Sequence, residues 1–313
     1  MRLVGSVVAW LALSGIVLGQ SSDRKLKKLP ENVVVETDVE YGRVGDRALV
    51  LDLVQPDERS DKPLPVVAFI HGGGWRNGSK ASGLLPVALL ASTGNYVGVT
   101  IEYRLTGEAI WPAQINDCKA AIRWIRANAS KYNIDPNKIG VWGNSAGGHL
   151  VSMLGTTGDV SKLEGQSGSA GYSSRVNCVV DFCGPSDLLL ESEEAPKRVL
   201  DPESSVSKLL GGPITERREV AIEASPARYA TSDDPPFFVV HGTKDPLVPL
   251  AQAEHMVQAL ERAGVPVTFS RIEGGGHGIR GPEITARVQQ FFDKNLRGQS
   301  VEISQEPIVV APE

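Results

Sequence analysis

The sequence predicts an α/β fold in which a mostly parallel central sheet carries helices on both faces. Short apolar runs alternate with amphipathic stretches along most of the chain, and several of these runs end at glycine-rich turns. Continuous apolar runs are typical of parallel strands that are buried on both sides. With 313 residues, of which 41% are hydrophobic, the chain is long enough for one large domain with a sizeable core.

The first elements are two β-rich segments, 33–41 and 48–54, which a glycine-containing turn joins into an expected antiparallel pair. Buried strands are then expected at 66–70, 96–101, 139–142, 176–182, 237–240 and 267–272. Amphipathic patterns predict helices at 115–132, 250–263 and 283–296. Because the active groups of such sheets collect at the carboxyl ends of the strands, the residues that follow each run are the candidates for a site.

Composition sets the boundaries of the main domain. Residues 1–19 begin with a positively charged residue, continue with an apolar run and end at a small residue, and this pattern predicts a secretory signal peptide. Residues 20–32 are expected to be a mobile leader. The main domain is expected at 33–296, with a charged, cap-like insertion at 187–232 and a disordered tail at 297–313. A cleaved signal predicts a secreted or periplasmic protein without stable membrane insertion, although the cleavage position stays open.

Charge and cysteine content exclude several classes of protein. The formal net charge is -5 and no basic stripe is present, so no nucleic-acid partner is expected. Cys118, Cys178 and Cys183 are too few for a disulfide scaffold. Cys178 and Cys183 fall on one predicted strand and point to opposite faces. This disfavours a bridge between them, but a bend after Gly184 leaves the question open.

The first chemical motif is Gly-Asn-Ser-Ala-Gly at 143–147, which follows an apolar strand and precedes a helical pattern. A nucleophile elbow requires this context, because its serine sits on a sharp strand-to-helix turn and the flanking glycines avoid Cβ clashes. The turn lifts the Ser145 hydroxyl above the sheet, and the new helix aims its amides at developing negative charge. Ser145 is therefore the candidate nucleophile.

The second motif is His-Gly-Gly-Gly-Trp at 71–75, at the end of an earlier apolar strand. Consecutive glycines allow two backbone N–H groups to point at one oxygen, and with the N–H of Ala146 they form a candidate oxyanion hole. His71 is expected to brace this loop rather than to catalyse. Trp75 is the candidate substrate-binding residue, as a wall of the acyl pocket.

Two further motifs complete a catalytic triad. One follows the predicted strand at 237–240 and is His241-Gly242-Thr243-Lys244-Asp245. The other follows the last predicted strand and is Gly274-Gly275-Gly276-His277-Gly278. The order Ser145, Asp245, His277 along the chain is that of the α/β-hydrolase fold. His277 is expected to take the proton of Ser145 and return it to the leaving group, while Asp245 orients the imidazole.

Other residues compete for these roles. His149 is carried on the helix after Ser145, and His255 lies in a helical run, where we expect it to be solvated. Asp181, Asp233 and Asp234 are alternative acids, but only Asp245 follows a strand end in the right interval. The histidines have no metal-ligand spacing, so no metal and no cofactor are expected.

These motifs resemble the hormone-sensitive-lipase-like branch of α/β-hydrolase esterases. The Tyr103-Arg104-Leu105 segment, the Trp-Pro-Ala-Gln stretch at 111–114 and the helix from 117 to 124 are also similar to that branch. The segments 224–226 and 233–245 look closer to a secreted bacterial subgroup that includes acetylxylan and feruloyl esterases. The resemblance spans about 33–295 and implies oxyanion donors at Gly73, Gly74 and Ala146. Many members of the branch carry an acid where this chain has Asn144.

Together, the residues and the resemblance predict a secreted serine carboxylesterase that forms an acyl-enzyme on Ser145. The expected substrates are short-chain or aromatic acyl esters, either small or on plant polysaccharide, and the insertion at 187–232 is expected to shape the alcohol side. The alternatives are a general short-chain carboxylesterase and an amidase or aryl-formamidase with the same triad. A non-catalytic binding domain is disfavoured, because such domains usually lose the nucleophile or the histidine. Neither the natural ester nor the oligomeric state follows from the sequence.

Overall fold

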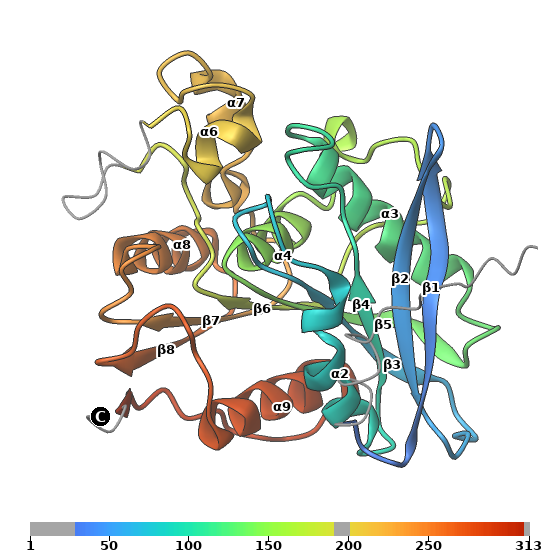
Figure 1. The fold of residues 1–313 in the computed structure, drawn as a ribbon. Coiled ribbons are helices and arrows are strands. Elements are labelled where there is room, and N and C mark those ends of the chain that lie inside the picture. The colour runs from blue at the N-terminus through green and yellow to red at the C-terminus, as the bar shows by residue number, and fades with distance from the viewer. Residues whose placement is uncertain (1–28, 191–200, 310–313) are drawn as a thin grey trace, which may run out of the picture.

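The computed structural model describes residues 29–190 and 201–309, so the predicted signal peptide lies outside the described residues. The described chain forms a nine-stranded sheet in the order β1-β2-β4-β3-β5-β6-β7-β8-β9 (Figure 1). β1 and β2 pair antiparallel, as do β2 and β4, and all other neighbours are parallel. The strands are Val33–Val44, Arg47–Pro56, Leu64–Ile70, Val97–Ile101, Ile134–Asn144, Cys178–Phe182, Phe237–Gly242, Val267–Glu273 and Ile308–Val309.

The helices cover both faces of the sheet, as the sequence predicts. α2 (Leu84–Ala91) and α9 (Pro282–Arg297) lie on one face, below the sheet in Figure 1. α3 (Ala113–Ala127), α4 (Ala146–Thr156) and α8 (Leu250–Ala263) lie on the other. The α/β-hydrolase fold is therefore confirmed, with an open and mostly parallel sheet.

Burial on both faces explains the continuous apolar runs. In β3, Val66, Ala68 and Ile70 join the core cluster beneath α3, α4 and α8. The intervening Val67 and Phe69 pack instead into the clusters that contain α9 and α2. Because each face of the strand meets a helix layer, neither set of side chains can be polar.

At both ends of the domain, the described residues of the segments expected to be mobile or disordered contact the domain. In the expected mobile leader, Leu29 packs against the α2 cluster and Asn32 accepts a hydrogen bond from the Asp57 N–H at 3.1 Å. In the expected disordered tail, Ile308–Val309 forms β9 beside β8, and Ile303 packs against the α9 cluster. Residues 29–32 and 298–309 have little periodicity of their own, and these contacts hold them to the domain.

The insertion between β6 and β7 contains short helices above the C-terminal ends of the strands (Figure 1). These are α6 (Ser205–Leu210), α7 (Arg218–Glu223) and the 3-10 helix η3 (Pro226–Tyr229). Two further 3-10 helices, η1 (Lys80–Ser82) and η2 (Ser161–Leu163), lie in other connections. The backbone of α6 reaches the main domain, because Leu209 O accepts from Trp111 N at 2.8 Å.

The described part of the chain contains no disulfide. Cys118, Cys178 and Cys183 are buried free thiols, so the bridge between Cys178 and Cys183 is not formed. Within residues 29–190 and 201–309, none of the helices has the length and apolar character needed to cross a membrane.

Candidate active site

The strand-to-helix turn at Ser145 has the strained backbone of a nucleophile elbow. Ser145 has φ of 56° and ψ of -121°, values that residues with a side chain rarely adopt. The Ser145 N–H donates to Phe182 O at 2.7 Å, and its C=O accepts from His149 N at 3.0 Å. These bonds fix the turn between β5 and α4, with Ser145 on the wall of a cavity.

The two glycines of the elbow are required by close backbone approach. A Cβ on Gly147 would lie 2.0 Å from Ile70 O at the end of β3. A Cβ on Gly143 would lie 2.3 Å from Gly147 O. Both distances are far shorter than any real Cβ contact, so only glycine lets the elbow pack against β3.

The loop after β3 brings free backbone N–H groups to the same cavity. Gly73 and Gly74 have φ of 113° and 60°, and α4 begins at Ala146. Among the described residues, the N–H groups of Gly73, Gly74 and Ala146 have no acceptor. All three residues line the cavity at Ser145. The predicted oxyanion donors therefore surround one space, at the positive end of a helix.

Asp245 and His277 meet across the loops that follow β7 and β8. His277 Nδ1 donates to Asp245 Oδ2 at 2.7 Å, which leaves Nε2 as the free ring nitrogen. Asp245 Oδ1 accepts from the N–H groups of Leu247 at 2.8 Å and Val248 at 2.9 Å. Burial alone would raise the pKa of Asp245, but the bonds from His277 and the two N–H groups hold it below its usual value. Asp245 is thus a carboxylate suited to orient and stabilise an imidazolium.

A second layer behind Asp245 was missed by the sequence analysis. The Cys183 thiol, at a residue with φ of 52°, contacts the Asp245 carboxyl, and burial raises the pKa of that thiol. His241 Nε2 donates to Val248 O at 2.8 Å and lies 3.5 Å from Asp245 Oδ2. Cys183 follows the carboxyl end of β6, and this position was the signal that could have singled it out.

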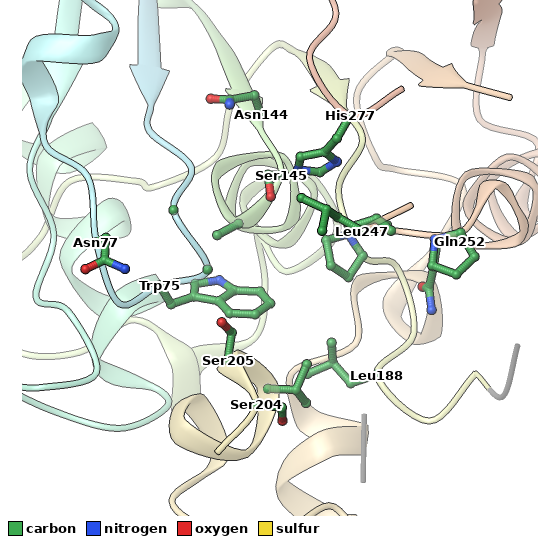
Figure 2. A pocket seen from close by; sticks show the side chains of 17 residues that line it. Trp75, Asn77, Asn144, Ser145, Leu188, Ser204, Ser205, Leu247, Gln252 and His277 are labelled. Atoms are coloured by element: carbon green, nitrogen blue, oxygen red, sulfur yellow. The ribbon is translucent and has the colours of Figure 1, made fainter. Parts of the chain in front are cut away.

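Ser145 and His277 face one cavity of about 470 Å³ (Figure 2). Trp75 lies across the centre of this cavity in Figure 2, and the walls of the cavity are mostly apolar. The insertion and Trp75 line the same cavity. The lining residues that sequence reasoning missed come mainly from the insertion and from the loop after Asp245: Leu188, Ser204, Ser205, Val206, Leu247, Val248 and Gln252.

The side chains of Trp75, His149 and His71 stabilise the loops around the site through hydrogen bonds and ring contacts. Trp75 Nε1 donates to His149 Nδ1 at 3.3 Å, and His149 Nε2 donates to Ala224 O at 2.7 Å. Both ring nitrogens of His149 are therefore engaged, and neither is free to take the proton of Ser145. Burial lowers the pKa of His149 to about 4. His71 stacks on Tyr103 with ring centroids 4.3 Å apart and donates to Gly72 O at 2.8 Å, as expected of a brace.

The alternative acids are engaged elsewhere. Asp181 accepts from Ser152 Oγ at 2.9 Å and from the Gly184 N–H at 2.9 Å, beneath the elbow. Asp233 pairs with Arg175 at 2.7 Å on the surface, and Asp234 bonds Thr231. His255 is partly buried and lies 3.6 Å from Asp187. Of the described acids, Asp245 is the one that accepts a bond from His277.

Comparison with known proteins places this arrangement in a family. The profile of the family described as BD-FAE matches residues 51–260, which include Ser145 and Asp245. The chain belongs to the BD-FAE family. This confirms the α/β-hydrolase resemblance that the motifs suggest.

Curated relatives of this BD-FAE chain are named as esterases. Esterase LipC of Mycobacterium tuberculosis is 34% identical over 236 residues, which cover 75% of this chain and 58% of the relative. The probable carboxylic ester hydrolase LipM of the same organism is 32% identical, over 88% of this chain and 64% of the relative. The chain thus spans less than two thirds of the length of these relatives.

Among solved structures, a truncated carbohydrate esterase from gut microbiota is similar to this BD-FAE chain. It superposes with a TM-score of 0.76 at 30% identity and covers 84% of this chain and 96% of its own.

Proposed function

We propose that this protein is a serine carboxylesterase that forms an acyl-enzyme on Ser145. The observation that carries the proposal is the 2.7 Å bond between His277 Nδ1 and Asp245 Oδ2, since His277 lines the same cavity as Ser145. A carboxylate-held imidazole beside an elbow serine is the arrangement that acyl transfer requires. The names of the curated relatives support the same activity.

The chemistry proceeds in two halves. Ser145 Oγ attacks the ester carbonyl carbon while His277 Nε2 takes the hydroxyl proton, and the N–H groups of Gly73, Gly74 and Ala146 stabilise the oxyanion. His277 then gives the proton to the alcohol oxygen as the bond to the acyl carbon breaks. A water molecule repeats the sequence from the acyl-enzyme, which releases the acid and restores Ser145.

The cavity at Ser145 is suited to the acyl group. Its oxyanion donors fix where the carbonyl oxygen lies, and the apolar side chains of Trp75, Leu188 and Val206 extend from that point. A volume of about 470 Å³ accommodates a short or aromatic acyl group. This supports short-chain or aromatic acyl esters as substrates.

We further propose that the acyl groups are carried by plant polysaccharide and that the protein acts as a secreted or periplasmic enzyme. The similarity to the carbohydrate esterase from gut microbiota supports this. A bifunctional acetyl ester-xyloside hydrolase from Caldicellulosiruptor lactoaceticus is also similar, with a TM-score of 0.67 at 28% identity over 80% of this chain and 89% of its own. The export signal expected at residues 1–19 fits an extracellular polymer.

A general short-chain carboxylesterase is the second candidate, which the plain esterase names of LipC and LipM favour. The two are separated by offering acetylated xylan, methyl ferulate and p-nitrophenyl acetate to the purified protein, with Ser145→Ala as the control. Serine-dependent release of acetate or ferulate at rates near the model ester supports the polysaccharide deacylase. Activity on the model ester alone supports the general esterase, and no serine-dependent ester hydrolysis contradicts both.

A further inference from the structure

A second cavity meets the first at the catalytic residues. It has a volume of about 580 Å³ and lies between α2 and α9, on the face of the sheet opposite α4 and α8. Asn144 and His277 line both cavities. Figure 2 shows these two residues on the side of the first cavity away from Ser204 and Leu188. We call the second cavity the α2–α9 groove.

The base of the α2–α9 groove is aromatic. Phe69, Trp142 and Phe182 stand at the ends of β3, β5 and β6, and Trp142 meets each phenylalanine edge to face at 5.4 Å and 5.5 Å. The side of α2 adds Leu85 and Leu89, which are 42% and 46% exposed. Large apolar side chains at the mouth of a groove that reaches the catalytic histidine are typical of a binding surface rather than of scattered surface residues.

Polar side chains with free hydrogen-bonding groups stand among these apolar walls. Asn144, Arg280 and Gln289 line the groove, and within the described chain none of their side chains has a hydrogen-bond or ion-pair partner. They offer two amides and one guanidinium beside an apolar base. An alkyl chain in this place would leave these groups without hydrogen-bond partners. A pyranose ring combines an apolar face with a rim of hydroxyl groups, so it matches both features.

We propose that the α2–α9 groove is the alcohol-side subsite and that it binds the glycosyl unit to which the acyl group is attached. This rests on the proposed esterase function. His277 returns its proton to the leaving alcohol, so the alcohol must lie against His277. The α2–α9 groove is a cavity that shares His277 and Asn144 with the acyl cavity.

The test compares two acetyl esters that differ only in the alcohol, acetylated xylo-oligosaccharide and ethyl acetate. Gln289→Ala and Arg280→Ala should each lower the ratio of kcat/KM for the sugar ester to that for ethyl acetate at least about tenfold, mainly through KM, because each removes a hydrogen-bonding group from the subsite. Gln290→Ala and Lys294→Ala are matched controls, since both residues lie on α9 but outside the groove. They should leave the ratio unchanged.

A third variant tests the space itself. Thr285 is exposed on the wall of the groove, so Thr285→Trp should narrow it without disturbing the core and should lower the same ratio. If the wild type cleaves both esters through Ser145 and all three groove variants keep its ratio, the subsite assignment is overturned while the esterase survives. If the wild type cleaves neither ester, the proposed function itself fails.

Discussion

Gly147 packs so closely under Ile70 that a Cβ on Gly147 would lie 2.0 Å from Ile70 O. This contact joins the turn after β5 to the end of β3, and these two strands carry the nucleophile and the oxyanion loop. The relative position of Ser145, Gly73 and Gly74 therefore depends on the absence of a Cβ at residue 147. A change at Gly147 should disturb folding and catalysis together.

Gly147→Ala is accordingly expected to destabilise the protein severely, by more than about 3 kcal/mol, because the clash is with backbone that cannot move independently. Urea or thermal unfolding of purified variants measures this. Gly107→Ala is the matched control, since its Cβ would meet nothing within 4 Å. A Gly147→Ala protein as stable as the Gly107→Ala protein would show that the elbow is not packed as described.

Asp245→Asn should lower kcat by about 10³- to 10⁴-fold with little change in KM, because an amide cannot hold the required tautomer of His277 or stabilise its charged form. The fold should be retained, which circular dichroism and the melting temperature check. Asp233→Asn is the control, a surface acid that pairs with Arg175 away from the site. A loss of less than tenfold in Asp245→Asn would assign the orienting acid elsewhere.

Asp181 should make stability depend on pH. Burial raises the pKa of this carboxyl to about 6 from the ordinary 3.8, so the folded state holds its proton more tightly than the unfolded chain. The resulting stability is fully present below about pH 3.8 and is lost as the pH rises through about 6. Asp181→Asn removes this loss, so the unfolding free energy of the variant relative to wild type should rise by about 2 kcal/mol between about pH 4 and pH 7.

Urea unfolding at a series of pH values measures that difference. His149, whose pKa burial lowers to about 4, imposes the opposite slope in an overlapping range. That slope is common to both proteins and cancels when they are compared. Asp46→Asn, in the exposed turn between β1 and β2, is the control and should show no such trend. A pH-independent difference for Asp181→Asn would mean that the carboxyl is solvated in the folded state.

The acyl cavity makes a prediction about chain length. Val206 lines it from α6, so Val206→Phe should fill part of the cavity and lower kcat/KM for p-nitrophenyl hexanoate relative to the acetate at least about tenfold. Val220→Phe adds the same group on α7, outside the cavity, and should leave the preference unchanged. Equal loss on both esters in Val206→Phe would place the acyl group somewhere else.

The fold and the pairing of Asp245 with His277 could be predicted from the sequence, because both predictions depend on local sequence patterns. Apolar runs with glycine-rich ends identify buried strands, and the carboxyl ends of parallel strands meet at one edge of a sheet. Ser145, Asp245 and His277 could therefore be assigned to one catalytic triad before any distance was known. The catalytic roles of these residues stay predictions that the experiments here test.

The features that the sequence did not predict depend on tertiary contacts. Ile308 and Val309 are a strand only because β8 offers an edge to pair with, and so the tail was expected to be disordered. From the sequence alone, Cys183 is interpreted as a small buried hydrophobic residue, and only the structure shows that the Asp245 carboxyl contacts its thiol. The α2–α9 groove exists because two helices far apart in sequence lie side by side, and periodicity within either helix carries no sign of it.

The most direct test of the account is to trap the acyl-enzyme. The protein is mixed with p-nitrophenyl acetate, quenched in acid during the first turnover, and digested for peptide mass mapping. The account predicts a burst of p-nitrophenol and an acetyl group on Ser145 in the wild type, and neither in Ser145→Ala. A serine-independent turnover, or an acetyl adduct on another residue with Ser145 unmodified, would contradict it.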